Sequence, residues 1–415
     1  MPRPSARFFT ILGAIVAGGL VLRIAVVIAY APTNLPIDDG LWYHGAANLL
    51  ADGRGFLDPF VYVFLGHSRQ SAGHPPLWPL VLTPVSWLGG TSVFAHQVTQ
   101  AVVGGLAVFA VGGLGREMAG ERAGLISGGI AAVYPLFWVT TGDLYSESLY
   151  ALVVASMLWA AYWFLRRPSA AAAVTLGAAT ALAALCRGEA LLFVPFLVVP
   201  VVLLTRAPEH PRVRTAGVAI LAAVVVLAPW TIFNTTRFAK PVPVSTSFGF
   251  VIAGANCPET YDGAQLGAWN VACASVERPG DDSQRSAELR HIGITYARNH
   301  LDRLPVVVAA RLGRTYELYV IEPHVFGPSW LEIITTGAWY AVALLAFAGA
   351  VILRRRGTSL VPVIATVAVV TVTVVITWGA ARFRVPVDII AITLAAAAVD
   401  HWWSRAAARS SPQPR

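Results

Sequence analysis

Residues 8–31 read FFTILGAIVAGGLVLRIAVVIAYA, an apolar run of 24 residues with a single charged side chain, Arg23. About 20 apolar residues in a helix span the hydrocarbon core of a bilayer. The end of the run, Ala29-Tyr30-Ala31, is similar to a signal-peptide cleavage site. The apolar part of a signal peptide is only about 7 to 15 residues long, however. We therefore predict an uncleaved first transmembrane helix.

The whole chain has the same character. Of its 415 residues, 56% are hydrophobic and 13% are charged, whereas a soluble domain carries about 25% charged residues. This composition excludes a soluble globular enzyme, a disordered chain and a coiled coil, and it indicates an all-α polytopic membrane protein. The net charge of +8 does not indicate a nucleic-acid partner, because the basic residues stand in short clusters between apolar runs. Such clusters orient membrane proteins.

Ten segments are predicted to span the membrane. The segment 77–89 is excluded from them, since it has 13 residues and two prolines and is better interpreted as re-entrant or interfacial. The predicted spans are 8–31, 92–115, 123–140, 145–165, 170–186, 190–205, 216–234, 330–353, 359–378 and 385–403.

Arginine placement predicts the orientation of these spans. With both termini in the cytoplasm, 15 of the 29 arginines fall in short cytoplasmic segments, as the positive-inside rule expects. The extracytoplasmic face then holds the loops 32–76 and 235–329, with a surface helix at 40–52 in the first. The second loop contains a predicted helix at 283–299 and an amphipathic stretch at 304–319. We predict one transmembrane domain over 1–415.

Cys257 and Cys273 lie 16 residues apart in the loop 235–329. Disulfides form in oxidising, extracytoplasmic compartments. The two residues therefore form either a disulfide or a pair of free thiols.

Two adjacent acids, Asp38 and Asp39, stand seven residues beyond the first apolar run. Paired carboxylates at a membrane surface suit a general base, alone or beside a carboxylate that orients a substrate or ligates a metal. A carboxylate at the boundary of water and lipid is also a candidate for a raised pKa. The alternative interpretation is an ordinary solvated loop.

Two further stretches belong to the same predicted face. His74 precedes a Pro-Pro pair that fixes the entry into the segment 77–89, and its imidazole can donate a hydrogen bond to a phosphate. Asp143 and Glu147 follow where the chain leaves the membrane. An acid in the first turn of a helix is also favoured by the helix dipole alone.

Arginines occur on this face as well. Arg187 and Glu189 interrupt two apolar runs, and ionisable groups in such places are functional candidates, with a local ion pair as the alternative. Arg382 and Arg384 lie where the positive-inside rule disfavours them. Because arginine forks match phosphate oxygens, a lipid phosphate at the outer surface would compensate these charges.

The order and spacing of these motifs resemble the C-type (GT-C) membrane glycosyltransferases. Within that group the chain is similar to the bacterial branch of protein O-mannosyltransferases and lipid A aminoarabinose transferases. The stretches that carry the resemblance are IDDGLWYHGAANLLADGRGF, GHPPLWPLVL, YPLFWVTTGDLYSESLYALVV, ALAALCRGEALLF, APWTIFNTTRFAKPVPVSTSFGFVIAGAN and ARFRVPVDIIAITLAAAA.

The resemblance implies a GT-C fold and transfer of a sugar from a polyprenyl-phosphate donor to a hydroxyl of a lipid, glycan or protein. Transfer would occur on the outer face of a bacterial plasma membrane. Asp38 would be the base with Asp39 beside it, and Glu147 would position the acceptor or, with Asp38, a divalent cation such as Mg²⁺ or Mn²⁺. No nucleotide or redox cofactor is expected. The substrate-binding residues would be Tyr43, His74, Asp143, Arg187, Glu189, Asn234, Arg382 and Arg384.

His74 departs from the family pattern, which has a lysine before the two prolines, so its charge depends on pH. Two other functions remain as alternatives. A transporter or flippase of lipid-linked sugars also needs many spans, but it predicts charges along one path through both faces and often inverted repeats. A non-catalytic scaffold leaves the acids and the outer arginines without a role.

Overall fold

The computed structural model describes residues 4–30, 38–205, 212–275, 278–318 and 329–410. Within these ranges the chain folds into 19 α-helices, and the only β-pairing there is an isolated bridge between Leu57 and Gln70. The start of the predicted loop 32–76 and the end of the loop 235–329 lie outside the described residues.

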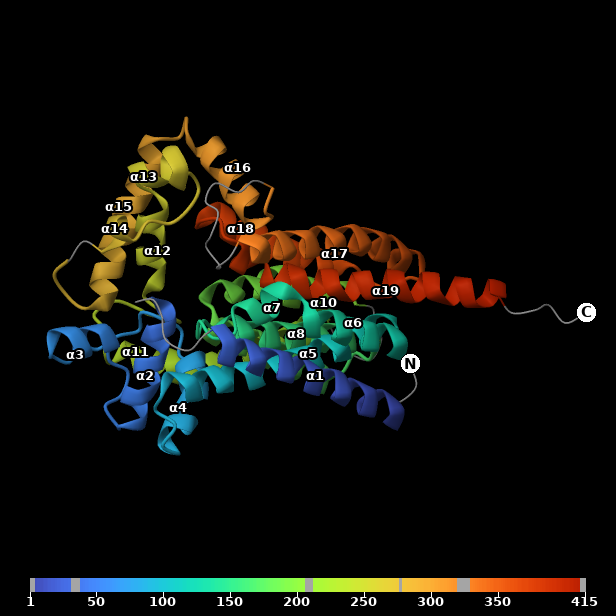
Figure 1. The fold of residues 1–415 in the computed structure, drawn as a ribbon. Coiled ribbons are helices and arrows are strands. Elements are labelled where there is room, and N and C mark those ends of the chain that lie inside the picture. The colour runs from blue at the N-terminus through green and yellow to red at the C-terminus, as the bar shows by residue number, and fades with distance from the viewer. Residues whose placement is uncertain (1–3, 31–37, 206–211, 276–277, 319–328, 411–415) are drawn as a thin grey trace, which may run out of the picture.

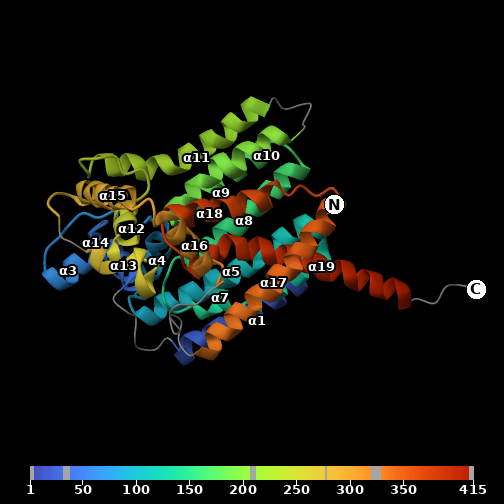
Figure 2. The same cartoon turned by 90° about the horizontal axis from the view of Figure 1, so that it is seen from above.

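Long helices form a bundle in which most axes run roughly along one direction (Figures 1 and 2). In the described part of the chain, five helices are long and apolar enough to cross a membrane: α1, α5, α8, α11 and α17. The protein is therefore a multi-pass membrane protein. The bundle helices are α1 (Ala6–Tyr30), α5 (Val93–Ala119), α6 (Glu121–Val133), α8 (Glu147–Arg166), α9 (Ala170–Cys186), α11 (Arg212–Thr235), α17 (Ser329–Arg355), α18 (Val361–Ile376) and α19 (Val385–Ser410).

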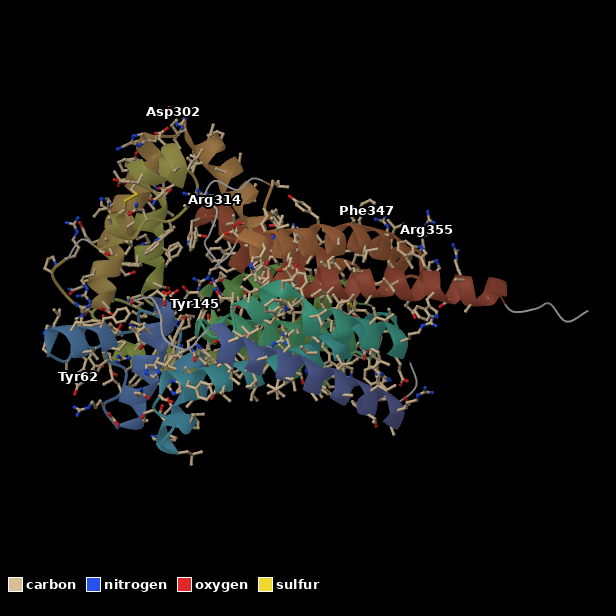
Figure 3. All side chains as sticks on the ribbon, in the orientation of Figure 1. Tyr62, Tyr145, Asp302, Arg314, Phe347 and Arg355 are labelled. Atoms are coloured by element: carbon tan, nitrogen blue, oxygen red, sulfur yellow. A yellow bond between two sulfur atoms is a disulfide. The ribbon has the colours of Figure 1, made fainter. Side chains whose placement is uncertain are left out.

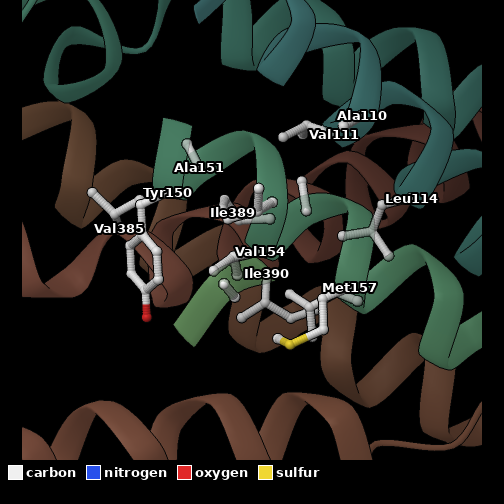
Figure 4. Packing of buried hydrophobic residues seen from close by; sticks show 14 of the residues in the cluster. Ala110, Val111, Leu114, Tyr150, Ala151, Val154, Met157, Val385, Ile389 and Ile390 are labelled. Atoms are coloured by element: carbon white, nitrogen blue, oxygen red, sulfur yellow. The ribbon is translucent and has the colours of Figure 1, made fainter. Parts of the chain in front are cut away.

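Helix α19 forms the centre of the bundle and packs on α17, α6, α5 and α8. Its residues from Val385 to Ala398 are buried on every side, the pattern of a helix enclosed by others. Figure 4 shows Ile389 and Ile390 among side chains of α5 and α8. A Cβ on Gly349 of α17 would lie 1.9 Å from the carbonyl oxygen of Leu394, so a small residue permits the close approach of these helices.

Two predicted spans are helical but interrupted. The segment 123–140 divides into α6 and α7 (Pro135–Val139), because a proline has no N–H to continue the helix. The segment 190–205 begins as the 3₁₀-helix η1 (Gly188–Leu192), continues as the π-helix η2 (Val194–Val198) and ends as α10 (Val199–Leu204). The predicted segments thus match helices, while the number that cross the membrane stays a prediction.

The helices outside the bundle gather at one of its ends. The first residues of α1 and the last turns of α19 lie at the opposite end (Figure 1). The helices of this outer group are α2 (Asp39–Ala51), α3 (Pro59–Leu65), α4 (Leu77–Trp87), α12 (Ser247–Ala255), α13 (Pro258–Tyr261), α14 (Val271–Ala274), α15 (Asp282–Asn299) and α16 (Leu304–Thr315), with the short η3 (Gly263–Gln265).

These elements confirm several sequence predictions. The helices expected at 40–52 and 283–299 are α2 and α15, and the amphipathic stretch at 304–319 forms α16. The short segment at 77–89 forms α4, an 11-residue helix. At 1.5 Å per residue, its length of roughly 16 Å is too small to span a bilayer. Cys257 and Cys273 are joined in a disulfide.

Candidate active site

The first element of the site is the start of α2. Asp38 is the N-cap of this helix, and its Oδ1 accepts a hydrogen bond from the backbone N–H of Gly40 at 2.9 Å. Carboxylates are favoured at this position because they accept hydrogen bonds from N–H groups that have no partner within the helix. Their negative charge is also stabilised by the positive end of the helix dipole. Asp39 occupies the first turn of α2. Helix capping therefore places both acids at the end of the bundle where the outer helices gather.

The second element is residues 140–146, which connect α7 to α8 and which we name the acidic loop. The Tyr145 hydroxyl donates a hydrogen bond to Oδ2 of Asp38, and Figure 3 labels Tyr145 where the bundle meets the outer helices. The loop also touches the backbone of α2, because a Cβ on Gly40 would lie 1.9 Å from the carbonyl oxygen of Asp143. The acidic loop and the start of α2 thus form one unit.

Glu147 links the acidic loop to two arginines. Its Oε1 accepts hydrogen bonds from Nη1 of Arg187 at 2.8 Å and from Nε of Arg382 at 2.6 Å. Arg187 also donates to Glu189 at 2.6 Å, and Nη2 of Arg382 lies 3.3 Å from Oδ2 of Asp39. Segments separated by more than 200 residues in sequence therefore converge on the 4%-exposed Glu147.

His74 completes the group of charged side chains. Its Nε2 lies 3.6 Å from Oδ1 of Asp39, and its Nδ1 lies 3.2 Å from the Tyr43 hydroxyl. The Trp42 ring packs beside the imidazole, with 4.6 Å between ring centroids. The guanidinium of Arg382 lies 4.4 Å from the centroid of the Tyr145 ring. Aromatic rings from α2 and the acidic loop thus orient both His74 and Arg382.

Burial and charge separate the pKa values of the three aspartates. Burial raises the pKa of Asp38, although the hydrogen bonds from Tyr145 and Gly40 oppose the shift. Burial acts the same way on Asp39, but the charges of His74 and Arg382 outweigh it and lower the pKa of Asp39. Burial, with the charges of Asp38 and Glu147, raises the pKa of Asp143 to about 7. Sites whose surroundings shift the pKa values of neighbouring carboxyl groups in opposite directions are typical of acid–base catalysis.

The basic groups of the site are affected in opposite directions. Burial lowers the pKa of His74, against the attraction of Asp39. The pKa values of Arg187 and Arg382 are raised: burial alone would lower them, but the neighbouring carboxylates, Glu147 among them, prevail. These two arginines therefore hold the permanent positive charge of the site.

Two predicted site residues lie apart from this group. Arg384 is fully buried, donates to Asp388 at 3.0 Å and pairs with Glu317 at 3.2 Å. Its guanidinium stacks over Trp339 at 4.1 Å. The buried Asn234 donates to the carbonyl of Val242 at 3.3 Å. Both side chains bind other parts of the fold rather than the site.

The two carboxylates predicted to ligate a divalent cation, those of Asp38 and Glu147, also bind other groups of the site. Oε1 of Glu147 is already bound by two guanidinium groups, and both oxygens of Asp38 accept hydrogen bonds. Among the described residues, three side chains of metal-ligand type have their ligand atoms within 4.8 Å of one another: Cys257, Glu259 and Cys273. The two cysteines of this group form the disulfide. Oε2 of Glu147, by contrast, is buried without a hydrogen-bond partner, and this oxygen is open to a cation ligand.

Sequence reasoning missed the residues that hold the acidic loop. Tyr145 gave no signal among the other tyrosines. Gln97 and Gln100 are fully buried in the apolar helix α5, and both donate to carbonyl oxygens of residues 140–145. Polar side chains inside an apolar run are a recognisable signal, and this signal could have identified the two glutamines.

The fold is shared with the archaeal oligosaccharyltransferase AglB from Archaeoglobus fulgidus. A structure of it tethered to an acceptor peptide has a TM-score of 0.62 and 14% identity, over 96% of this chain and 50% of that chain. A complex with an inhibitory peptide and a dolichol-phosphate has a TM-score of 0.59 and 14% identity, over 99% and 52%. The chain thus spans about half the length of these enzymes, and it has the GT-C fold.

A structure of ArnT from Cupriavidus metallidurans bound to undecaprenyl phosphate is also similar, at a TM-score of 0.45 and 15% identity, over 98% of this chain and 82% of that chain. Residues 73–233 match the family model described as dolichyl-phosphate-mannose-protein mannosyltransferase. This range includes His74, Asp143, Glu147 and Arg187. No curated protein sequence matches the chain.

Proposed function

We propose that the protein is a membrane glycosyltransferase that moves a sugar from a polyprenyl-phosphate-linked donor to a hydroxyl acceptor. The observation that carries this proposal is the convergence of Asp38, Asp39, Glu147, Arg187 and Arg382 at one end of a transmembrane bundle. Carboxylates able to accept a proton lie there beside guanidinium groups able to bind a phosphate. The match to a mannosyltransferase family supports the same reaction class.

The similar solved structures support the donor class. Their descriptions place a dolichol-phosphate on AglB and undecaprenyl phosphate on ArnT. An acceptor peptide is tethered to AglB in another. We extend the donor class alone to this chain, with a lipid, glycan or protein hydroxyl as acceptor.

In the proposed reaction, Asp38 removes the proton of the acceptor hydroxyl while the oxygen attacks the anomeric carbon. The C–O bond to the phosphate breaks, and polyprenyl phosphate leaves with the bonding electron pair, so that the anomeric configuration inverts. Burial raises the pKa of Asp38 above that of an exposed aspartate, which makes its carboxylate a stronger base. Tyr145 holds that carboxylate in place through its hydroxyl.

Charge on the leaving phosphate is stabilised by Arg382 and Arg187, which are oriented in advance by Glu147. Donors fixed before the reaction need no reorganisation when charge develops. His74 adds a further hydrogen-bond donor. Asp143 holds its proton up to about pH 7, which limits negative charge where the phosphate must bind. No step of this mechanism passes through a metal ion.

Membrane orientation is part of the proposal. We place the end of the bundle with the outer helices and the charged site on the extracytoplasmic side of a bacterial plasma membrane. Both termini then lie in the cytoplasm, in agreement with the distribution of arginines. The residues 32–76 and 235–329 form extracytoplasmic loops of a single transmembrane domain. The described charged site lies at one end of the bundle, whereas a flippase needs a path between both ends.

Substitution of the base tests the reaction. Asp38→Asn, purified in lipid nanodiscs, is expected to lower the rate of sugar transfer by about 10²- to 10⁴-fold, the usual contribution of a general base. Binding of undecaprenyl-phosphate-mannose should stay within threefold. Asp52→Asn is the matched control, because Asp52 is an exposed cap at the other end of α2. Full transfer activity of a folded Asp38→Asn variant contradicts the mechanism.

A further inference from the structure

The acidic loop has a backbone conformation that its sequence does not favour. Leu144 adopts a φ of +58°, a left-handed conformation that is uncommon for a branched, non-glycine residue. Such conformations persist only where surrounding contacts fix them, and they cluster at functional sites. The contacts that fix this loop come from side chains of α4 and α5.

Gln100 makes most of these contacts. Its Oε1 accepts hydrogen bonds from the backbone N–H groups of Gly142 at 3.0 Å and Leu144 at 3.1 Å. Its Nε2 donates to the carbonyl oxygens of Thr140 at 3.3 Å and Tyr145 at 3.0 Å. The side chain is fully buried. One amide group therefore satisfies four backbone groups of a six-residue stretch.

Two neighbours complete the set. Nε2 of Gln97, one helical turn before Gln100, donates to the carbonyl of Gly142 at 2.9 Å. Nε1 of Trp78 in α4 donates to the carbonyl of Leu144 at 2.8 Å. Both peptide groups around the strained φ of Leu144 are thus bound by side chains. The loop held in this way carries the Asp143 carboxyl and the Tyr145 hydroxyl, and that hydroxyl donates a hydrogen bond to Asp38.

We propose that Gln100 is a positioning residue that fixes the acidic loop so that Tyr145 and Asp143 face the carboxylate of Asp38. This inference rests on the proposed transferase function for its catalytic consequence, although the structural role is independent of it. The side chain must offer two acceptor sites and two donors at one place. Leucine supplies none of them, and glutamate loses the amide donors and places a carboxyl group against carbonyl oxygens.

Gln100→Leu and Gln100→Glu test the proposal. Because small displacements of reacting groups cost about 10²-fold in rate, kcat is expected to fall by about 10- to 100-fold in Gln100→Leu, with KM for undecaprenyl-phosphate-mannose within threefold. Loss of the Tyr145 hydrogen bond raises the pKa of Asp38, so the acidic limb of the pH–rate profile should move to higher pH. General destabilisation of the fold would not move that limb. Thr99→Val, on the adjacent position of α5, is the control.

Hydrogen exchange separates this inference from the proposed function. In both Gln100 variants, the amides of residues 140–147 should exchange faster while the rest of α5 and α8 stays protected. If the wild type transfers no sugar but the exchange changes as expected, the positioning role stands and the transferase function fails. If exchange, kcat and pH profile of folded Gln100→Glu all match the wild type, the positioning role is wrong. If Gln100→Leu does not fold, the same measurements on Gln100→Glu test the positioning role.

Discussion

At the residue scale, Arg382 and Arg384 illustrate what sequence can decide. Both stand in one motif, and the same phosphate-binding role was predicted for each. They lie in the 3₁₀-helix η4 (Ala381–Arg384), where residues two apart point about 120° away from each other. Arg382 therefore reaches Glu147, while Arg384 reaches Asp388 and Glu317. The spacing identified the motif, but only the backbone geometry divides its two arginines between different clusters.

Asp143 provides a prediction that combines stability and pH. Its pKa is raised to about 7, first by burial and then by Asp38 and Glu147. The folded state holds a proton that an unfolded chain releases near pH 4, so stability falls as pH rises from 4 to 7. Asp143→Asn should therefore raise the unfolding temperature above pH 7 and make no difference near pH 4, as measured by thermal unfolding in nanodiscs. The exposed Asp302 (Figure 3) provides the control Asp302→Asn.

This result would also show that the wild-type site carries a cost in stability, as functional sites commonly do. An unfolding temperature of Asp143→Asn that equals the wild type at every pH would mean that the carboxyl is not buried near other acids as the structure has it.

At the element scale, the contact between α2 and the acidic loop depends on Gly40. The carbonyl oxygen of Asp143 occupies the place of a Cβ at 1.9 Å, and backbone cannot move aside as a flexible side chain can. Gly40→Ala is expected to separate α2 from the loop and lower kcat by at least tenfold, measured as initial rates of sugar transfer. Gly18→Ala in α1 is the matched control, because nothing lies within 4 Å of its added Cβ. Equal rates for both variants would contradict the contact.

A closed ring of hydrogen bonds also connects α2, α4 and α5. His44 Nδ1 lies 3.0 Å from His96 Nδ1, and His96 Nε2 lies 2.9 Å from the Ser86 hydroxyl. That hydroxyl donates to Oδ1 of Asn48 at 2.7 Å. Nδ2 of Asn48 lies 3.3 Å from Nε2 of His44 and closes the ring. One assignment satisfies every contact: both histidines are neutral, with the protons on His44 Nδ1 and His96 Nε2. A proton added to either ring places two N–H groups against each other.

The ring therefore makes stability depend on pH. Burial lowers the pKa of His44, so its contribution is fully present above about pH 6.5, the ordinary histidine pKa, and is lost as pH falls below that value. We expect the unfolding temperature to drop between pH 7 and pH 5, and to drop less in His44→Gln. His291→Gln on the exposed face of α15 is the control. Parallel curves for the wild type and His44→Gln would rule out this role.

Most elements could be predicted from run length and proline positions. The short apolar run at 77–89 differs from the predicted spans in its length, and it forms the 11-residue α4. The break at Tyr134-Pro135 was missed, since its flanking residues are all apolar and hydropathy does not register a lost hydrogen bond. The contacts of Gln100 were beyond prediction, because they require the position of a loop 40 residues away.

At the scale of the whole molecule, the few charges are sorted by end of the bundle. Ion pairs of Glu117 with Arg116 and Arg166 lie in the segments predicted to be cytoplasmic, and Arg122 of the first of these segments pairs with Asp400, near the end of the predicted span 385–403. Helix α2, which begins at the Asp38–Asp39 pair, and Tyr145 of the acidic loop lie at the other end, beside the outer helices (Figures 1 and 3). The low charge content thus serves two separate purposes: orientation at one end and, in our proposal, chemistry at the other.

In our proposal, this outer site cleaves a lipid-linked sugar from its phosphate. The most direct measurement supplies undecaprenyl-phosphate-mannose, labelled in the sugar, to the purified protein in liposomes with lipid, oligosaccharide and peptide acceptors together. We predict release of undecaprenyl phosphate in equal amount to glycosylated acceptor, and loss of both with Asp38→Asn. Movement of intact donor across the bilayer without release of undecaprenyl phosphate, or release that Asp38→Asn leaves unchanged, would contradict it.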